Sequence, residues 1–320
     1  MTPQKATARQ VWLALTAVYL VWGSTYLGIR VAVRTIPPFL MAGSRFLIAG
    51  GLLFAWSIRR GDARDDRLGW PQWRATALVG TLLLACGNGG VSWAEQRVPS
   101  GVASLIIAGV PIWMAVIASL RGDEPIRART VAGLAVGFAG AALLLRRGES
   151  GGGALDPTGI AVLVGASICW ATGSVVSRSL RLPMRPLVAT GMEMICGGAV
   201  LMVVGAVSGE LSGFRIAAVS GQSLAGWLYL IVFGSWVGFA AYMWLLRNAR
   251  TSLVSTYAYV NPVVAVFLGW SILGERVSWL TIAAGALILG AVALIVLGPG
   301  RRVSDPATVP VLSPEAGAKP

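Results

Sequence analysis

Two segments of the chain resemble each other in sequence. They are Val21–Arg30, Val-Trp-Gly-Ser-Thr-Tyr-Leu-Gly-Ile-Arg, and Cys169–Arg178, Cys-Trp-Ala-Thr-Gly-Ser-Val-Val-Ser-Arg. The two segments align without a gap at an offset of 148 residues, and a second offset of 151 residues aligns the later parts of the chain. Matches at so many helix starts, glycines and prolines indicate an internal duplication. The matched pairs are Trp22 with Trp170, Arg30 with Arg178, Pro38 with Pro186, Gly43 with Gly191, Gly50 with Gly198, Trp93 with Trp244, Ser104 with Ser255, Pro111 with Pro262, Glu124 with Glu275 and Thr130 with Thr281.

The composition of the chain predicts a membrane protein. Of the 320 residues, 56% are hydrophobic and only 12% are charged, and the mean hydropathy is +0.73. A soluble protein needs about a quarter of its residues charged to cover its surface. A chain with only half of that fraction of charged residues cannot form a water-soluble globule of this size. We therefore expect lipid to cover most of the outer surface.

Ten apolar stretches are long enough to cross a bilayer as helices, which takes roughly 20 residues each. The connections are short, so we expect an all-α integral membrane protein whose function lies within or between ten transmembrane helices. The duplication divides it into a first five-helix repeat, residues 1–148, a second five-helix repeat, residues 157–297, and a disordered cytoplasmic tail, residues 298–320. The expected spans are 11–31, 39–58, 75–94, 100–120, 129–145, 158–177, 187–207, 223–246, 253–273 and 279–297.

The distribution of Lys and Arg predicts the orientation. With the N-terminus in the cytoplasm, 18 basic residues fall in inside segments and 7 in outside segments, which favours both termini inside. The first span follows a short basic segment without a cleavage site and is expected to be an uncleaved signal anchor. Because five is odd, the second repeat must enter the membrane from the opposite side. Inverted repeats of this kind are the architecture of many secondary transporters, with the substrate site near the midplane between the halves.

Several classes of function are excluded by what the sequence lacks. There is no histidine, which removes Ser-His-Asp and Cys-His catalysis and His-ligated metal or haem. The spans also lack aspartate, so we expect no enzyme, no cofactor and no metal site. The chain has no Gly-x-x-x-x-Gly-Lys-Ser/Thr motif for direct use of ATP. The net charge of +13 comes from basic clusters between spans and does not indicate nucleic-acid binding, and the three cysteines, Cys86, Cys169 and Cys196, form no C-x-x-C pair and are expected to be packing residues.

The motifs also resemble a known family. Trp22-Gly23-Ser24-Thr25-Tyr26, with Ile29-Arg30, Pro37-Pro38 and Arg45-Phe46, resembles the start of the EamA module of the drug/metabolite transporter superfamily. The runs Gly87-Asn88-Gly89, Trp170-Ala171-Thr172-Gly173-Ser174 and Ser255-Thr256-Tyr257-Ala258-Tyr259-Val260-Asn261-Pro262 are similar to its YedA-type subfamily. The resemblance covers residues 11–297. It implies two inverted EamA repeats, a location in the bacterial inner membrane, and export of small metabolites or drugs.

Two charged residues lie inside the expected spans at positions matched by the first offset. Arg45 and Glu193 each lie about six residues from the start of their span, and charges at that depth are functional candidates by default. One alternative is a structural salt bridge, although opposed helices would leave about 12 Å between the two levels in a 30 Å hydrocarbon core. The other gives them separate roles, with Arg45 attracting an anionic group near the outer side and Glu193 binding a cation or a proton near the inner side.

The remaining candidates are polar and aromatic residues that recur at helical spacing. Tyr19, Trp22 and Tyr26 share one face of the first span. Such an aromatic stripe can equally be packing, but the neighbouring Ser24 and Thr25 favour a solute. Pro111 and Pro262 are expected to interrupt the fourth and ninth spans, either as bends with a function or as ordinary membrane prolines. The substrate-binding candidates are Trp22, Tyr26, Arg45, Asn88, Trp113, Trp170, Ser174, Glu193, Trp236, Tyr257 and Asn261.

These observations favour a secondary transporter that exports a small organic solute, either an amino-acid-like metabolite or a drug, by alternating access. Proton coupling through Glu193 and uncoupled movement both stay open. The alternatives are a passive channel or facilitator and an intramembrane enzyme. The expected partners are the solute and the lipid bilayer, with homo-oligomerisation left open.

Overall fold

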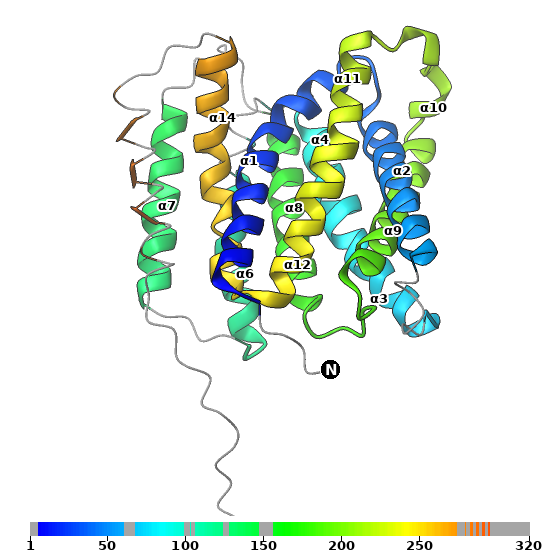
Figure 1. The fold of residues 1–320 in the computed structure, drawn as a ribbon. Helices are drawn as coiled ribbons and strands as arrows, with labels where there is room; N and C mark the ends of the chain where they lie inside the picture. The colour runs from blue at the N-terminus through cyan, green and yellow to red at the C-terminus, as the bar shows by residue number, and fades with distance from the viewer. Residues whose placement is uncertain are drawn as a thin grey trace, which may run out of the picture.

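The computed structural model describes residues 6–60, 68–98, 103, 106–123, 128–146 and 156–273, with scattered positions between 279 and 294. Every regular element in this part of the chain is helical (Figure 1). Six helices there are long and apolar enough to cross a membrane: Ala8–Ala32, Pro38–Arg59, Trp70–Ala94, Pro157–Val176, Pro186–Val207 and Gly221–Asn248. Most of the expected tenth span and the whole expected tail lie outside the described residues.

The first half contains five helical units in the expected order. Helix α1 begins with a capping box, in which Thr7 and Gln10 satisfy each other's backbone N–H groups. Pro38 occupies the first turn of α2, where a helix does not need its N–H. The third unit is continuous but is built from three segments. The elements are α1 (Ala8–Ala32), α2 (Pro38–Arg59), α3 (Trp70–Gly80), η1 (Thr81–Asn88), α4 (Gly89–Ala94), α6 (Val110–Leu120) and α7 (Ala128–Arg146).

The described part of the second half repeats the order of the first four units. Asp156 caps α8 by accepting a hydrogen bond from the backbone N–H of Thr158. The connection after the second helix contains two short helices, α10 and η2. The elements are α8 (Pro157–Val176), α9 (Pro186–Val207), α10 (Glu210–Gly213), η2 (Ile216–Ala218), α11 (Gly221–Tyr229), η3 (Leu230–Phe239), α12 (Ala240–Asn248), α13 (Thr251–Val254) and α14 (Tyr257–Leu273).

The matched helices α2 and α9 pack against each other in antiparallel directions. A Cβ atom at Gly50 would lie 2.8 Å from the carbonyl oxygen of Gly191, and one at Gly198 would lie 3.1 Å from the carbonyl oxygen of Gly43. The 148-residue offset matches Gly43 with Gly191 and Gly50 with Gly198. Gly50 therefore contacts Gly191, the counterpart of Gly43, and Gly43 contacts Gly198, the counterpart of Gly50. Reciprocal contacts of this kind are the signature of a two-fold relation. The two repeats are therefore inverted about an axis that passes between α2 and α9.

The first helix of each half packs against the other half. Helix α1 contacts α11, η3, α12 and α14, while α8 contacts η1, α4 and α6. Helices α7 and α14 lie side by side at one edge of the bundle, and α2, α9 and α3 lie at the opposite edge (Figure 1). The two halves thus share one interior and do not form two separate bundles.

The third span of each half contains a π-helical segment. In the first half it is Thr81–Asn88, and in the second half it is Leu230–Phe239. The 151-residue offset aligns these two segments. A π-helix widens the turn and shifts the hydrogen bonds from i−4 to i−5, and such segments occur frequently at functional sites. Both segments reach the interior of the bundle.

The two matched prolines do not play matched roles. Pro111 was expected to interrupt the fourth span, and it instead lies in the first turn of α6, directly after a break at residues 108–109. Pro262 lies inside α14, as expected. A proline at a helix start needs no hydrogen bond for its missing N–H, so only Pro262 disturbs a helix interior.

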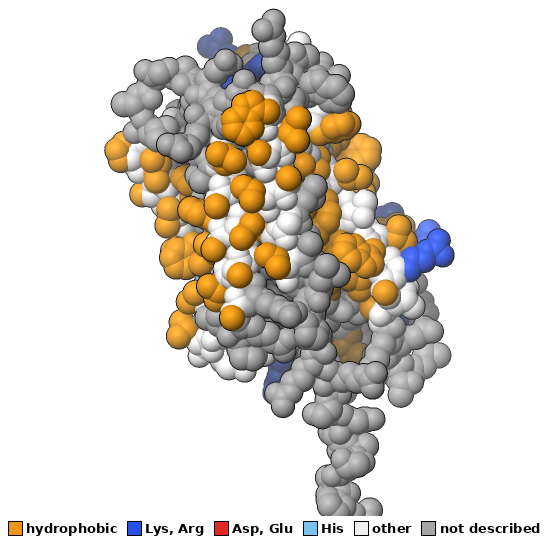
Figure 2. All heavy atoms as spheres, turned by 90° about the vertical axis from the view of Figure 1, so that its left-hand side faces the viewer, with side chains coloured by type: hydrophobic (Ala, Val, Ile, Leu, Met, Phe, Trp, Pro, Cys, Tyr) orange, Lys and Arg blue, Asp and Glu red, His pale blue; other side chains and the backbone are white. Residues whose placement is uncertain are grey.

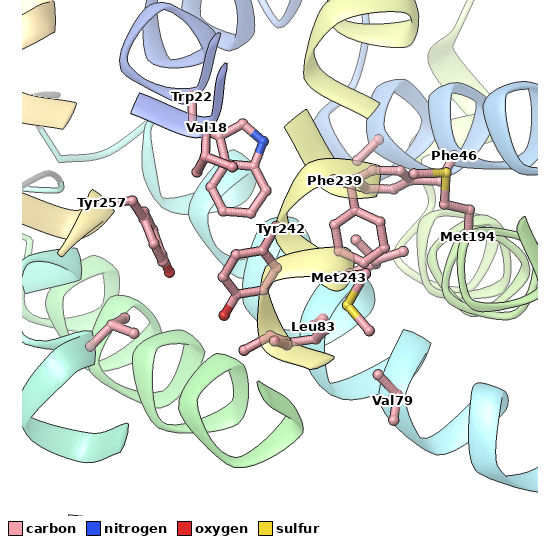
Figure 3. Close-up of a cluster of buried hydrophobic side chains, with 14 of the residues drawn as sticks. Val18, Trp22, Phe46, Val79, Leu83, Met194, Phe239, Tyr242, Met243 and Tyr257 are labelled. Carbon is pink, nitrogen blue, oxygen red and sulfur yellow. The ribbon is translucent and has the colours of Figure 1, made fainter. Parts of the chain in front are cut away.

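Apolar side chains cover the described outer surface as well as the core. The face that carries α7 and α14 shows mostly hydrophobic side chains (Figure 2), among them Val131, Phe138 and Phe267. Such a surface is stable in lipid and not in water. The core beneath it is a cluster of buried residues from both halves, including Phe46, Leu83, Met194 and Phe239 (Figure 3).

Candidate functional site

A cavity lies between the two halves at the centre of the bundle. Residues of α1, α2, η1, α4, α8, η3 and α14 line it, together with residues around the start of α6. Seven of the eleven substrate-binding candidates lie on its wall: Trp22, Tyr26, Arg45, Asn88, Trp170, Tyr257 and Asn261. The other four, Trp113, Ser174, Glu193 and Trp236, do not line it. We refer to this space as the central cavity.

An aromatic cluster forms one side of the central cavity. The ring of Trp22 lies 5.4 Å from the ring of Trp170 and 5.1 Å from that of Tyr257, both edge to face. Tyr242 supports them from α12, with its ring 4.8 Å from Trp22 (Figure 3). The hydroxyl of Tyr242 accepts a hydrogen bond from Trp170 Nε1 at 3.0 Å and bonds Ser174 Oγ at 2.6 Å. These bonds fix the rings, so the cluster offers a rigid aromatic surface.

Arg45 supplies the one charged side chain on the described wall of the central cavity. It is 97% buried, and its Nε donates to Ser235 Oγ at 2.8 Å. Its Nη1 is buried and has no hydrogen-bond partner among the described residues. A buried guanidinium without an anionic partner is costly, and an incoming anion would remove that cost. The geometry therefore favours a ligand that carries a carboxylate or another small anion.

Two asparagines add hydrogen-bond acceptors to the same wall. The Oδ1 atoms of Asn88 and Asn261 are buried and have no hydrogen-bond partner among the described residues. Unmade hydrogen bonds of buried amides are unusual in proteins. The described wall thus presents a cationic donor and two free acceptors, which suits a ligand that carries both an anion and an N–H group.

Glu95 lies just beyond the end of the third span. Both of its carboxylate oxygens are buried and lack a hydrogen-bond partner among the described residues. Burial raises the pKa of Glu95 to about 8, against the opposing field of Arg30. Tyr26, on the cavity wall, also lies within the electrostatic reach of Glu95. Glu95 is therefore a buried acid next to one end of the central cavity.

Glu193 is fully buried away from the central cavity. Neither carboxylate oxygen has a hydrogen-bond partner among the described residues, and the charge that acts on it belongs to Arg247 of α12. The described ion pairs do not include one between Glu193 and Arg45. The geometry thus favours separate roles over a salt bridge.

The other three candidates outside the wall are engaged elsewhere. Ser174 holds Tyr242, as described above, and supports the aromatic cluster from behind. Trp236 donates from Nε1 to the carbonyl oxygen of Ala49 at 2.9 Å, which ties η3 to α2. Trp113 is partly buried against the main hydrophobic core.

Two residues outside the set of substrate-binding candidates also shape the wall. Ser235 orients Arg45, and the carbonyl oxygen of Gly234 accepts a hydrogen bond from Trp22 Nε1 at 3.3 Å. Both lie in the π segment η3, next to Trp236, which was selected in their place. A small residue beside a selected tryptophan carries no signal of its own, and only the helix pairing reveals its role.

Two helical repeats around a central cavity are the architecture of many membrane transporters. Residues 9–146 and 157–297 each match the EamA-like transporter family, so the chain belongs to this family. It is accordingly a multi-pass transporter of the bacterial inner membrane.

Individual relatives agree with this assignment. The chain is 41% identical over 303 residues to the uncharacterized inner membrane transporter YedA of Escherichia coli strain K12, which covers 93% of this chain and 94% of the relative. It is 30% identical over 317 residues to a probable terminal-alkyne amino-acid exporter of Streptantibioticus cattleyicolor, covering 93% and 98%. A solved crystal structure that is 22% identical superposes with a TM-score of 0.74 over 91% of this chain and 98% of the other, and so shares its fold.

Proposed function

We propose that this protein exports an amino-acid-like solute from the cytoplasm by alternating access. The observation that carries the proposal is the free Nη1 of Arg45 on the wall of the central cavity. A carboxylate placed there would form a charge-assisted hydrogen bond to a group that is otherwise unsatisfied. A neutral or purely cationic solute would leave this guanidinium without a partner.

The rest of the wall supports a solute that also carries an ammonium group. The free Oδ1 atoms of Asn88 and Asn261 can accept hydrogen bonds from it. The faces of Trp22 and Tyr257 suit either a cation or an apolar side chain. An amino acid has all three features, and the relative named as a probable terminal-alkyne amino-acid exporter supports this class.

Alternating access is supported by the reciprocal contacts of the two repeats. If the halves exchange their conformations, a cavity open to one side becomes open to the other. The π segments of the third spans are natural places for such bending, because their turns are already wider than those of an α-helix. With both termini in the cytoplasm, residues near the start of α9 lie towards the inner face. Export would then be driven by entry of protons, and uncoupled exchange is the alternative.

Flux measurements in proteoliposomes test this function. We expect the purified protein to take up a mixture of ¹⁴C-labelled L-amino acids when vesicles are preloaded with the unlabelled mixture, with saturation and counter-exchange. At amino-acid concentrations near the half-saturation point of the wild-type protein, Arg45→Ala should strongly reduce this exchange, whereas Arg121→Ala, which alters an exposed arginine paired with Asp123, should not. A linear flux without counter-exchange would indicate a passive channel and reject the proposal.

A further inference from the structure

We infer that Glu193 is a proton-binding site separate from the central cavity, and that the crossing of α3 and α9 links it mechanically to that cavity. The inference rests on the proposed function, since it names the residue through which protons would act on the transporter. It combines two independent observations: a buried acid with no hydrogen-bond partner and an unusually close contact between two helix backbones.

The first observation is the isolation of the Glu193 side chain. Its exposed fraction is 0%, and both carboxylate oxygens lack a hydrogen-bond partner among the described residues. Ionisable groups within membrane spans are expensive and typically belong to ion or proton pathways. Because Glu193 does not line the central cavity, it is not a ligand for the solute. A single proton is small enough to use such an enclosed group.

The second observation is the helix crossing beside Glu193. A Cβ atom at Gly80 would clash with the backbone carbonyl oxygen of Glu193, and one at Gly197 would lie 2.5 Å from the carbonyl oxygen of Gly80. The two backbones are therefore in direct contact, with Glu193 one turn before Gly197. A shift of α9 at this point must displace α3, because no side chain lies between them to absorb it.

The crossing leads directly to the wall of the central cavity. Gly80 is the last residue of α3, and the π segment η1 starts at the next residue, Thr81. At the other end of η1, Gly87 and Asn88 line the cavity, and a Cβ atom at Gly87 would lie 2.8 Å from Trp170 Cε3. Protonation of Glu193 would thus change the electric field at the start of η1. The other end of η1 lies on the cavity wall, where the solute would bind.

The charged and titratable neighbours are compatible with this role. Arg247 of α12 provides the charge that acts on Glu193, and it also donates from Nη1 to the carbonyl oxygens of Pro183 and Met184. Cys196, on the same helix, is the titratable group that interacts with Glu193. The remaining ionisable side chains on the packed elements are Arg45 and Arg59 on α2, Arg74 on α3, Cys86 on η1, Glu210 on α10 and Tyr242 on α12; none of these forms a described ion pair or hydrogen bond with Glu193.

The coupled cycle moves one proton against one solute molecule. A proton from the outer side binds the Glu193 carboxylate, converts it to a neutral acid and leaves to the cytoplasm in the opposite conformation. The solute travels outward in the other half of the cycle. A variant that is permanently neutral at this position can still exchange solute for solute but cannot use a proton gradient.

The first experiment separates coupling from exchange in proteoliposomes, with the ¹⁴C-labelled amino-acid mixture as the probe. We expect Glu193→Gln to lose the uptake that an acidic vesicle lumen drives, while it retains counter-exchange. Glu95→Gln, the same change in the other buried acid, should retain proton-driven uptake. Retention of proton-driven uptake by Glu193→Gln would overturn the inference. If the wild-type protein moves no amino acid, the proposed function fails, and the second experiment decides the inference on its own.

The second experiment needs no solute. Asn88→Cys is introduced after Cys86, Cys169 and Cys196 are changed to serine, and its reaction with N-ethylmaleimide is measured with Glu193 and with Glu193→Gln. Taking the ratio of the two rates at each pH cancels the titration of the thiol itself. We expect this ratio to change between about pH 5 and about pH 8, because the protein with Glu193 can gain and lose a proton at this position and the Glu193→Gln variant cannot. A constant ratio would overturn the inference.

Discussion

Arg45 of the first repeat is held by Ser235 of the second, with Nε donating to Oγ at 2.8 Å. Ser235 Oγ in turn donates to the carbonyl oxygen of Leu230, five residues earlier, which is the spacing of a π-helix. The charge that we assign to solute binding is therefore positioned by the irregular backbone of the opposite half. Any movement between the repeats changes the position of this charge.

Replacing Arg45 should weaken solute binding more than it weakens the fold. A hydrogen bond to a charged group contributes about 1.5–3 kcal/mol, so Arg45→Ala should raise the half-saturation concentration for amino acids about 10- to 150-fold. Amino-acid amides, which lack the carboxylate, should compete poorly with the wild-type protein. Equal competition by amides and free amino acids would contradict the role of Arg45.

Replacing Ser235 should have a smaller effect of the same kind. Ser235→Ala leaves the charge of Arg45 in place but removes the acceptor of its Nε. We expect an increase of about 3- to 10-fold in half-saturation concentration, in line with one lost hydrogen bond. The matched control is Ser212→Ala, because Ser212 is exposed and its Oγ donates to the carbonyl oxygen of the neighbouring Gly209. An equal effect of both changes would argue against the positioning role.

Adding a methyl group at the contact between the repeats should destabilise the protein. Gly87→Ala places a Cβ atom 2.8 Å from Trp170 Cε3, and overpacking of this kind costs about 1–3 kcal/mol. Gly165→Ala serves as the control, because a Cβ atom there meets nothing within 4 Å. The melting temperatures of the detergent-solubilised variants should therefore fall only for Gly87→Ala. A fall of the same size in both would show that the contact is loose.

The buried acid Glu95 should make the stability of the protein depend on pH. Burial raises its pKa from 4.5 to about 8, so the folded protein binds this proton more tightly than the unfolded chain does. Its contribution to stability is thus fully present below about pH 4.5 and is lost as the pH rises through about 8. Between these values, the melting temperature of the wild-type protein should fall relative to that of Glu95→Gln. A constant difference between the two proteins would contradict the burial of this carboxyl group.

Local sequence signals predicted much of the fold and part of the site. The two offsets predicted the repeat and the order of the helices, because glycines and tryptophans at packed positions keep their spacing after duplication. Hydropathy alone selected Arg45, since a charge six residues inside an apolar span is conspicuous. The aromatic and amide candidates on α1, α8 and α14 also lie on the cavity wall.

The features that the sequence did not reveal depend on contacts between distant segments. The π segments η1 and η3 have ordinary apolar sequences, and their wide turns become apparent only in the packed bundle. Glu95 interacts electrostatically with Tyr26, which lies 69 positions earlier in the chain. Trp236 and Trp113 were selected as aromatic residues, but which face of a helix meets the cavity is decided by its tertiary partners.

The inverted threading of the two repeats through the membrane is the claim on which the transport mechanism depends. The most direct measurement is a pair of reporter fusions, one after Arg60 at the end of α2 and one after Gly209 at the end of α9. Inverted threading predicts that, at Arg60, a green fluorescent protein fusion fluoresces and an alkaline phosphatase fusion is inactive. At Gly209, it predicts a dark green fluorescent protein fusion and an active phosphatase. The same active reporter at both positions would place the two helix ends on one face of the membrane and contradict the account.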